Sequence, residues 1–157
     1  MLVLGGVVAT EAEALARLDA TLWSGAAFSK FREIVAAQGG EVRVIDDPGL
    51  LPRAKLVETW PAPRPGFVAA VDARAVAHAA VRLGAGRSRA EDVIDPAVGI
   101  AGLVKVGERV AAGHPLAEIH ANDPAALADA RALLAGAFTL ADAPVSSPPL
   151  VAEVIAE

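Results

Sequence analysis

The chain contains no cysteine and no tyrosine, and aromatic residues make up only 4% of its 157 residues. The absence of cysteine excludes disulfide bonds and thiolate chemistry, and it is compatible with a cytoplasmic protein. Because aromatic side chains are scarce, we expect the core of this 54% hydrophobic sequence to consist mainly of leucine, valine, isoleucine and alanine. A chain of this length can bury a sizeable core without disulfides or metal ions.

Long apolar runs and blocks of like charge are also lacking. No run reaches the length needed to span a membrane, and no charged-then-apolar signal segment opens the chain. The net charge is -5, with acidic and basic residues interspersed along the sequence. We therefore expect neither a membrane nor a nucleic acid as partner.

Two helices are predicted in the first 40 residues. Thr10 and Glu13 form the pattern of a capping box, in which a hydroxyl and a carboxylate each accept a free amide at the start of a helix. Apolar residues then recur at helical spacing up to Gly25, and again in a second stretch that ends at Gly39 and Gly40. We interpret these stripes as scaffold rather than as a binding surface.

The apolar residues 1–4, followed by Gly5 and Gly6, are typical of the end of a helix that closes on a left-handed glycine. Four residues cannot nucleate a helix, so this interpretation predicts that the front of the helix belongs to a longer polypeptide. A short initial strand is the alternative.

Residues 41–45 alternate in polarity and predict a short strand before a turn. Asp46 and Asp47 in that turn have two interpretations. Adjacent carboxylates can bind a divalent cation, but beside Pro48 and Gly49 they more often accept backbone amides of the turn itself.

Strand patterns occupy residues 54–60 and 67–72, and a helix is predicted over 73–83. Proline withholds a backbone donor, so the proline-rich residues 61–65 cannot form an interior strand of a sheet. We place a domain boundary there, which gives a helical and strand segment over residues 1–60 and a C-terminal domain over 61–157.

Residues 83–121 form a turn-rich β module. Gly107 and Gly113 allow sharp reversals of the backbone, and Val110, Leu116 and Ile119 are the predicted core residues around them. After this module, Asp123 as N-cap and Pro124 at the first helical position predict a helix, which is followed by strands over 138–141 and 150–155.

The motifs that could carry chemistry are all incomplete. The glycines of residues 84–86, with Arg87 and Arg89, could present amide and guanidinium groups to an anion, but the spacing fits neither a Walker loop nor a dinucleotide fingerprint. Ser146 and Ser147 lie in no nucleophile elbow.

The three histidines, His78, His114 and His120, do not form a predicted zinc site. A catalytic zinc needs three protein ligands, and His78 lies in a different predicted element from the other two. We therefore assign no catalytic, no cofactor-binding and no metal-binding residue, and no cofactor.

The glycine turns of the β module resemble those of biotinyl and lipoyl carrier domains, in which a hairpin presents one modifiable lysine. The sequence has no lysine at that place, because residues 120–124 read His-Ala-Asn-Asp-Pro and Lys105 precedes the turns. Covalent loading therefore has no attachment point.

Nearly the whole chain resembles the C-terminal region of the thymidine and pyrimidine-nucleoside phosphorylases. The residues that carry this resemblance are 1–6, 30–33, 36–40, 47–48, 50–52, 65–72, 83–87, 92–100 and 105–121. These enzymes cleave a pyrimidine nucleoside with phosphate to give the free base and a pentose 1-phosphate. Their full-length members are homodimers.

The resemblance implies an enzyme part without an active site. The family's phosphate-binding glycine-rich segment and its base-binding arginine, serine and lysine lie far N-terminal to this region, and these 157 residues hold no counterpart of them. The implied partner is the missing N-terminal helical domain, and phosphate and nucleoside would bind only in the complete enzyme.

The expected fold is α+β: a mixed-sheet α/β-hammerhead domain, similar to a barrel-sandwich, preceded by a short helical segment. The expected function is structural support of a catalytic lobe, with no activity alone. A stand-alone barrel-sandwich docking module is the alternative, and a nucleoside-monophosphate phosphorylase is a related third possibility. Base preference, sugar preference and oligomeric state stay open.

Overall fold

The structure, a computed structural model, describes residues 1–155 and divides into two compact units, Met1–Leu51 and Pro52–Glu157. This division precedes the boundary that we expected at 60/61. The physical reason is β1 (Leu56–Pro61), which is hydrogen-bonded to a strand of the second unit. Pro61 is the last residue of β1, which is an edge strand, and Pro63 and Pro65 lie in the connection that leaves it. No helix of the described residues is long and apolar enough to cross a membrane.

The first seven residues close like the end of a helix. The Gly6 amide donates to Val3 O and the Val7 amide donates to Leu2 O, each at 2.9 Å, and Gly6 has a φ of +68°. This pair of bonds around a left-handed glycine is a Schellman motif. The turn closed by a left-handed glycine is therefore confirmed, and the alternative of a strand is wrong.

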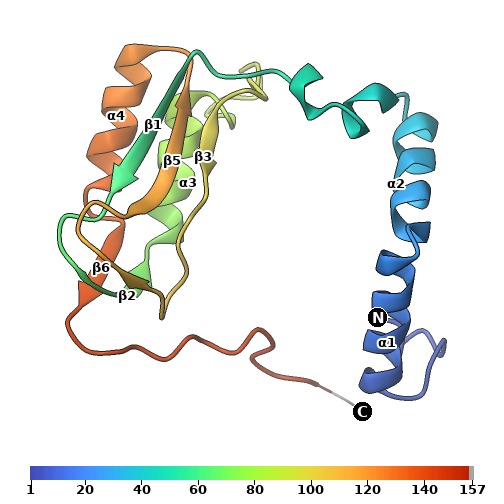
Figure 1. Cartoon of the computed structure of the whole chain (residues 1–157). Coiled ribbons are helices and arrows are strands. Elements are labelled where there is room, and N and C mark those ends of the chain that lie inside the picture. The colour runs from blue at the N-terminus through green and yellow to red at the C-terminus, as the bar shows by residue number, and fades with distance from the viewer. Residues whose placement is uncertain (156–157) are drawn as a thin grey trace. The chain divides into compact units, whose positions relative to one another are not determined.

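Two helices follow in the first unit, α1 (Glu11–Trp23) and α2 (Ala26–Ala37), and they contact each other (Figure 1). The predicted capping box is present. Thr10 Oγ1 accepts the Glu13 amide at 3.2 Å, and the Glu13 carboxylate accepts the Thr10 amide at 3.4 Å. Gly25, at a φ of +76°, separates the two helices as predicted.

The strand predicted over 41–45 is wrong, because Val42–Ile45 form a 3-10 helix, η1. The Glu41 carboxylate accepts the Arg43 amide at 3.0 Å and so starts a turn. A strand also needs a neighbouring strand, and the first unit, described in full, contains none. A second short 3-10 helix, η2 (Pro48–Leu50), follows.

The second unit is built around a three-stranded antiparallel sheet in the spatial order β1, β5, β3 (Figure 1). Its strands are β1, β5 (Pro115–Ala121) and β3 (Gly99–Ala101). β5 lies in the centre and pairs with β1 over residues 56–61 and with β3 over residues 99–101.

A second three-stranded antiparallel sheet has the order β4, β2, β6. Its strands are β4 (Arg109–Val110), β2 (Gly66–Val71) and β6 (Phe138–Ala141). The α+β class is confirmed. The expected mixed sheet is not found in the described residues, since every strand pair there is antiparallel and neither sheet closes into a barrel.

Helices α3 (Ala73–Leu83) and α4 (Pro124–Leu134) lie against one face of the first sheet (Figure 1). Asp72 caps α3 and Asp123 caps α4, each by accepting two backbone amides at 2.9–3.2 Å. The helix predicted over 73–83 and the Asp123 cap are both confirmed.

Two clusters of buried side chains form the core of the second unit. One lies between the first sheet and the two helices and includes Ile119 and Leu134, each fully buried. The other lies between the sheets and includes Leu116 and Val110. The three core residues predicted in the β module, Val110, Leu116 and Ile119, are buried to 2%, 1% and 0% exposure, and that prediction is confirmed.

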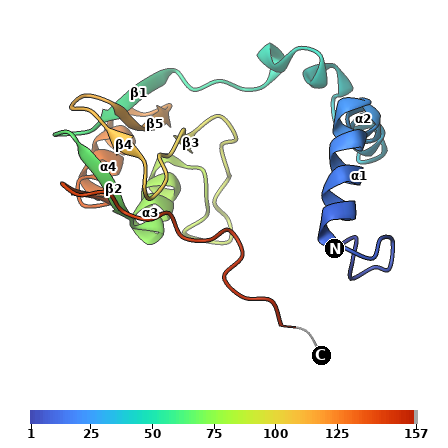
Figure 2. The same cartoon turned by 60° about the horizontal axis from the view of Figure 1, so that its bottom comes forward.

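The described residues after β6, 142–155, contain no helix and no strand, and we call them the tail. The strand predicted over 150–155 is therefore wrong for this structure. Its β-forming residues pair with no sheet edge, and Leu150 and Ile155 are almost fully exposed. Figure 2 shows the tail passing α3 and continuing away from both sheets.

A polar link joins the loop after α3 to the first sheet. The side-chain amide of Asn122 makes two hydrogen bonds. Its Nδ2 donates to Asp95 Oδ2 at 2.7 Å, and its Oδ1 accepts the backbone amide of Lys55 at 2.8 Å. Asp95 also accepts the Ala97 amide at 2.9 Å. The Ala97 amide, the Asn122 side chain and, less strongly, the Lys55 charge together hold the pKa of Asp95 below its ordinary value.

We predict that Leu116→Ala lowers the free energy of unfolding by about 2–5 kcal/mol, because it leaves a cavity in a fully packed site. Urea unfolding followed by circular dichroism measures the change. Val57→Ala on β1 is the control, since Val57 is 60% exposed. If both variants lose equal stability, Leu116 does not anchor the core.

We predict that Asn122→Ala raises the pKa of Asp95, because the ionised carboxylate loses a donor. Lys55→Ala should raise it less, because the Lys55 charge is the weakest of the favourable influences. Carbon-detected NMR titration of the Asp95 carboxyl measures both changes. An unchanged pKa in Asn122→Ala would contradict the link.

The Asp95 carboxyl also makes the free energy of unfolding depend on pH. Its folded pKa lies below its unfolded pKa, so its contribution to stability is present above the unfolded value and is lost as the pH falls through the folded one. Asn122→Ala should therefore lose less stability than the parent chain over that acidic range, as measured by urea unfolding at a series of pH values.

Candidate functional site

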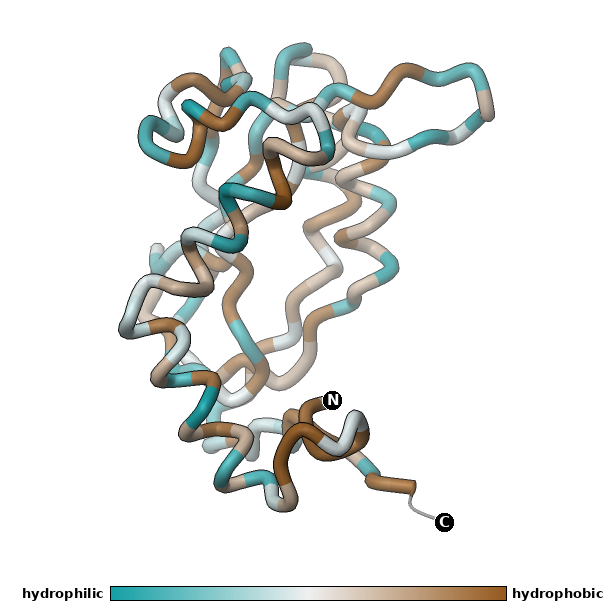
Figure 3. The backbone as a smooth tube through the Cα atoms, turned by 90° about the vertical axis from the view of Figure 1, so that its right-hand side faces the viewer, coloured by the Kyte–Doolittle hydropathy of each residue, from teal (hydrophilic) through white to brown (hydrophobic). Residues whose placement is uncertain are grey.

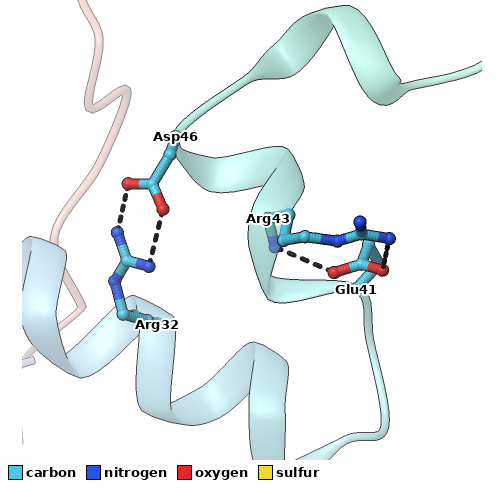
Figure 4. Close-up of polar contacts among 4 residues, drawn as sticks. All are labelled: Arg32, Glu41, Arg43 and Asp46. Atoms are coloured by element: carbon cyan, nitrogen blue, oxygen red, sulfur yellow. Dashed lines mark hydrogen bonds and ion pairs between the residues drawn. The ribbon is translucent and has the colours of Figure 1, made fainter.

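Four charged residues of the first unit form two neighbouring ion pairs (Figure 4). Arg32 holds both carboxylate oxygens of Asp46, and Arg43 binds Glu41 through its guanidinium at 2.7 Å. Hydrogen bonds from Arg43 lower the pKa of Glu41 to about 2, and the Arg32 guanidinium lowers the pKa of Asp46. A general acid at neutral pH needs a raised pKa, so neither carboxylate is suited to that role.

The turn at Asp46 and Asp47 holds no cation-binding pair. Asp46 is bound to Arg32, and Asp47 Oδ1 accepts the Gly49 amide at 2.9 Å. The turn-forming interpretation is confirmed for Asp47. Across residues 1–155, no group of three or more His, Asp or Glu side chains is placed to hold a metal ion.

The glycine loop that follows α3 uses its amides internally. Gly84 ends the helix at a φ of +102°. The amides of Ser88 and Arg89 both donate to Asp92 Oδ2 at 2.9 Å. The Asp92 carboxylate thus occupies the position at which the anion hypothesis would require a ligand.

The three histidines lie apart. Each borders a different hollow of the second unit: His78 on α3, His114 in the turn before β5, and His120 on β5. His120 Nε2 lies 3.6 Å from the carboxylate of Glu118 on the same strand. This arrangement gives a surface pair and no shared ligand site.

The segment that corresponds to the carrier hairpin has a different structure. β5 ends at Ala121, and α4 begins at Pro124 with Asp123 as its cap. A helix thus starts where a carrier domain would turn back and present its lysine. The structure supports the conclusion from sequence that covalent loading has no attachment point.

The second unit carries an apolar groove of about 670 Å³. We use "the groove" for the space between the α3 face with Val76 and Ala80, the loop with Leu103 and Val106, and the tail. Sequence reasoning did not predict it. The helical spacing of Val76 and Ala80 was the available signal, but it did not indicate the other two walls.

The lining of the groove is suited to binding apolar groups. Ser147 and Lys105 are the polar side chains among its lining residues. Ser147 Oγ donates to Val106 O at 2.9 Å, so its hydroxyl proton is directed at a backbone carbonyl rather than at a base. The groove therefore lacks an activated nucleophile.

Comparison with known proteins gives a consistent result along the chain. The profile of the pyrimidine nucleoside phosphorylase C-terminal domain matches residues 67–141, from β2 to the end of β6. Thymidine phosphorylase of Burkholderia orbicola (strain MC0-3) is 40% identical over 155 residues, and that of Burkholderia cenocepacia (strain HI2424) is 41% identical over 155 residues.

Both matches cover 98% of this chain and 35% of the relative, so the chain spans about a third of the length of these curated relatives. The profile match names the part of the enzyme to which the α+β unit corresponds. The whole-chain matches extend the similarity to the two-helix unit as well. By sequence, the chain is similar along nearly its whole length to the C-terminal region of thymidine phosphorylases, and its second unit matches the C-terminal domain of pyrimidine nucleoside phosphorylases.

Proposed function

We propose that this chain is the C-terminal α+β part of a pyrimidine-nucleoside phosphorylase and supports its catalytic lobe. The complete enzyme would cleave a pyrimidine nucleoside with phosphate into the free base and a pentose 1-phosphate. Thymidine is the substrate we test first, because the matched relatives are named thymidine phosphorylases.

The observation that carries this proposal is the exposed apolar surface of the first unit. Within residues 1–51, Ala14 is the one buried side chain. Large apolar residues along α1 and α2 are about half exposed or more: Leu15, Leu18, Leu22, Trp23, Phe28, Phe31 and Ile34. Figure 3 shows hydrophobic residues recurring among hydrophilic ones along the backbone.

An apolar stripe of this kind is stable only when another surface covers it. The curated relatives carry about two thirds of their length outside the matched region, which supplies a candidate for that surface. We infer that the stripes of α1 and α2 pack against the remainder of the enzyme in the complete protein.

The proposed role is mechanical rather than catalytic. We propose that phosphate and nucleoside bind to residues outside this chain, and that the chain alone is inactive. The buried clusters around β5 would then keep one lobe of the enzyme rigid while substrate binds elsewhere. We further propose a cytoplasmic homodimer as the complete form, as in the family.

A chimera tests the proposal. We would replace the matching third of the B. orbicola thymidine phosphorylase by this chain and measure phosphate-dependent release of thymine from thymidine. We predict activity in the chimera and none in this chain alone. A chimera that unfolds cooperatively, is monodisperse and yet releases no thymine would contradict the proposal.

Charged substitutions in the same chimera test the covered face. We predict that Leu18→Asp together with Phe31→Asp lowers stability and thymine release, because each would bury an unpaired carboxylate. Lys30→Asp is the matched control, since its side chain is 65% exposed. If the control and the double variant have equal stability and equal thymine release, the apolar face of α1 and α2 stays in solvent.

The stand-alone docking module remains the alternative, and one measurement separates it from the proposal. If residues 1–51 give dispersed amide NMR signals in the isolated chain, the first unit is folded without a covering surface. Collapsed signals for residues 1–51, beside dispersed signals for the second unit, support the enzyme-part proposal instead.

A further inference from the structure

The tail is anchored to the second unit beside the groove, beyond the ion pair that Asp142 makes with Arg64 near its start. Ser147 Oγ donates to Val106 O at 2.9 Å. At the neighbouring Gly107, which has a φ of +94°, a Cβ atom would overlap Ser147 and lie 3.1 Å from Val145 O. The absence of a side chain at Gly107 thus lets the tail approach the turn closely.

Beyond this anchor the tail borders the groove and then leaves it. Pro148 and Leu150 line the groove together with Val76 of α3. The following residues carry apolar side chains in solvent: Leu150, Val151, Val154 and Ile155 are 103%, 62%, 80% and 87% exposed. Four such side chains in six residues make a surface that water solvates poorly.

The charges of the groove and the tail are complementary. Lys105 is on the groove wall, and among the described residues it belongs to no ion pair. Glu153 is the one charged residue of 150–155, and it too is in no described ion pair. The apolar segment 150–155 thus carries a single acid, and the apolar groove carries a single base.

We propose that residues 150–155 of this chain bind back into the groove as a strap, with Glu153 paired to Lys105. The structure then represents the open arrangement, in which the anchor at Ser147 is made and the strap is not. The closed arrangement buries the apolar side chains of the segment against α3 and the 103–106 loop.

Tethering favours the chain's own segment over a separate partner. The anchor holds Leu150 at the edge of the groove, so the local concentration of the segment is high and little chain entropy is lost on closure. Fully extended, the six residues of 150–155 reach about 20 Å, which is long enough to cross a small groove. The strap stands independently of the proposed enzyme activity, because it needs no substrate and no missing domain.

A nitroxide label tests the strap. The chain has no native cysteine, so Ala152→Cys gives a single labelling site that keeps every apolar side chain of the segment. We expect the label to remove amide NMR intensity from Val76, Ala80 and Leu103, and reduction of the nitroxide to restore it. Unchanged intensities at these groove residues would overturn the proposal.

Two sets of variants make the result specific. Ser147→Ala should return part of the lost intensity, because it loosens the anchor. Lys105→Glu should also return intensity, and the exchange Lys105→Glu with Glu153→Lys should lose it again. A label on Thr139→Cys, in β6, is the matched control and should give the same pattern in all of these backgrounds.

A mixing experiment distinguishes binding of the segment within one chain from binding between two chains. Chains that contain nitrogen-15 but no nitroxide are mixed with chains that carry the nitroxide but no nitrogen-15. The amide signals then come only from the chains without nitroxide. Intensity loss that occurs only within the labelled chain supports the strap. Loss that occurs in the mixture to the same extent assigns the groove to the tail of a second copy and overturns the proposal.

Discussion

Burial of β5 on two sides is the constraint on which the second unit depends. Leu116 enters the cluster between the two sheets, whereas Ile119 and Ala121 enter the cluster beneath α3 and α4. The same strand is also the centre of its sheet, with β1 and β3 bonded to its two edges. A change in its register would therefore disturb both cores at once, because it would exchange the inward and outward side chains.

The two units differ in how much of their own apolar surface they bury. The second unit has layers on both sides of β5 and buries its largest core side chains completely. The first unit is a pair of amphipathic helices with a polar rim, and two helices cannot enclose both of their apolar faces. That difference connects the fold to the proposed function: one unit carries its own core, and the other needs a surface to cover it.

Several acidic side chains of this chain are held by partners close to them in the fold. Asp46, Asp92 and Asp95 each bind an arginine or backbone amides within a few ångströms. Those partners stabilise the ionised form, and the pKa values of Asp46 and Asp95 are lowered. Sequence reasoning assigned no catalytic residue but could not predict these partners, since Arg32 and Asp46 lie fourteen positions apart.

The sequence by itself determined the elements whose signals are local. The Thr10 capping box, the Asp123 cap and the glycine turns predict their helices and strands because each signal involves backbone groups only a few residues away. Strands were different: residues 41–45 and 150–155 have strand-like patterns and form none, because a strand exists only where a second one can pair with it. The tertiary structure alone decided those outcomes, and it alone assembled the groove from three segments distant in the chain.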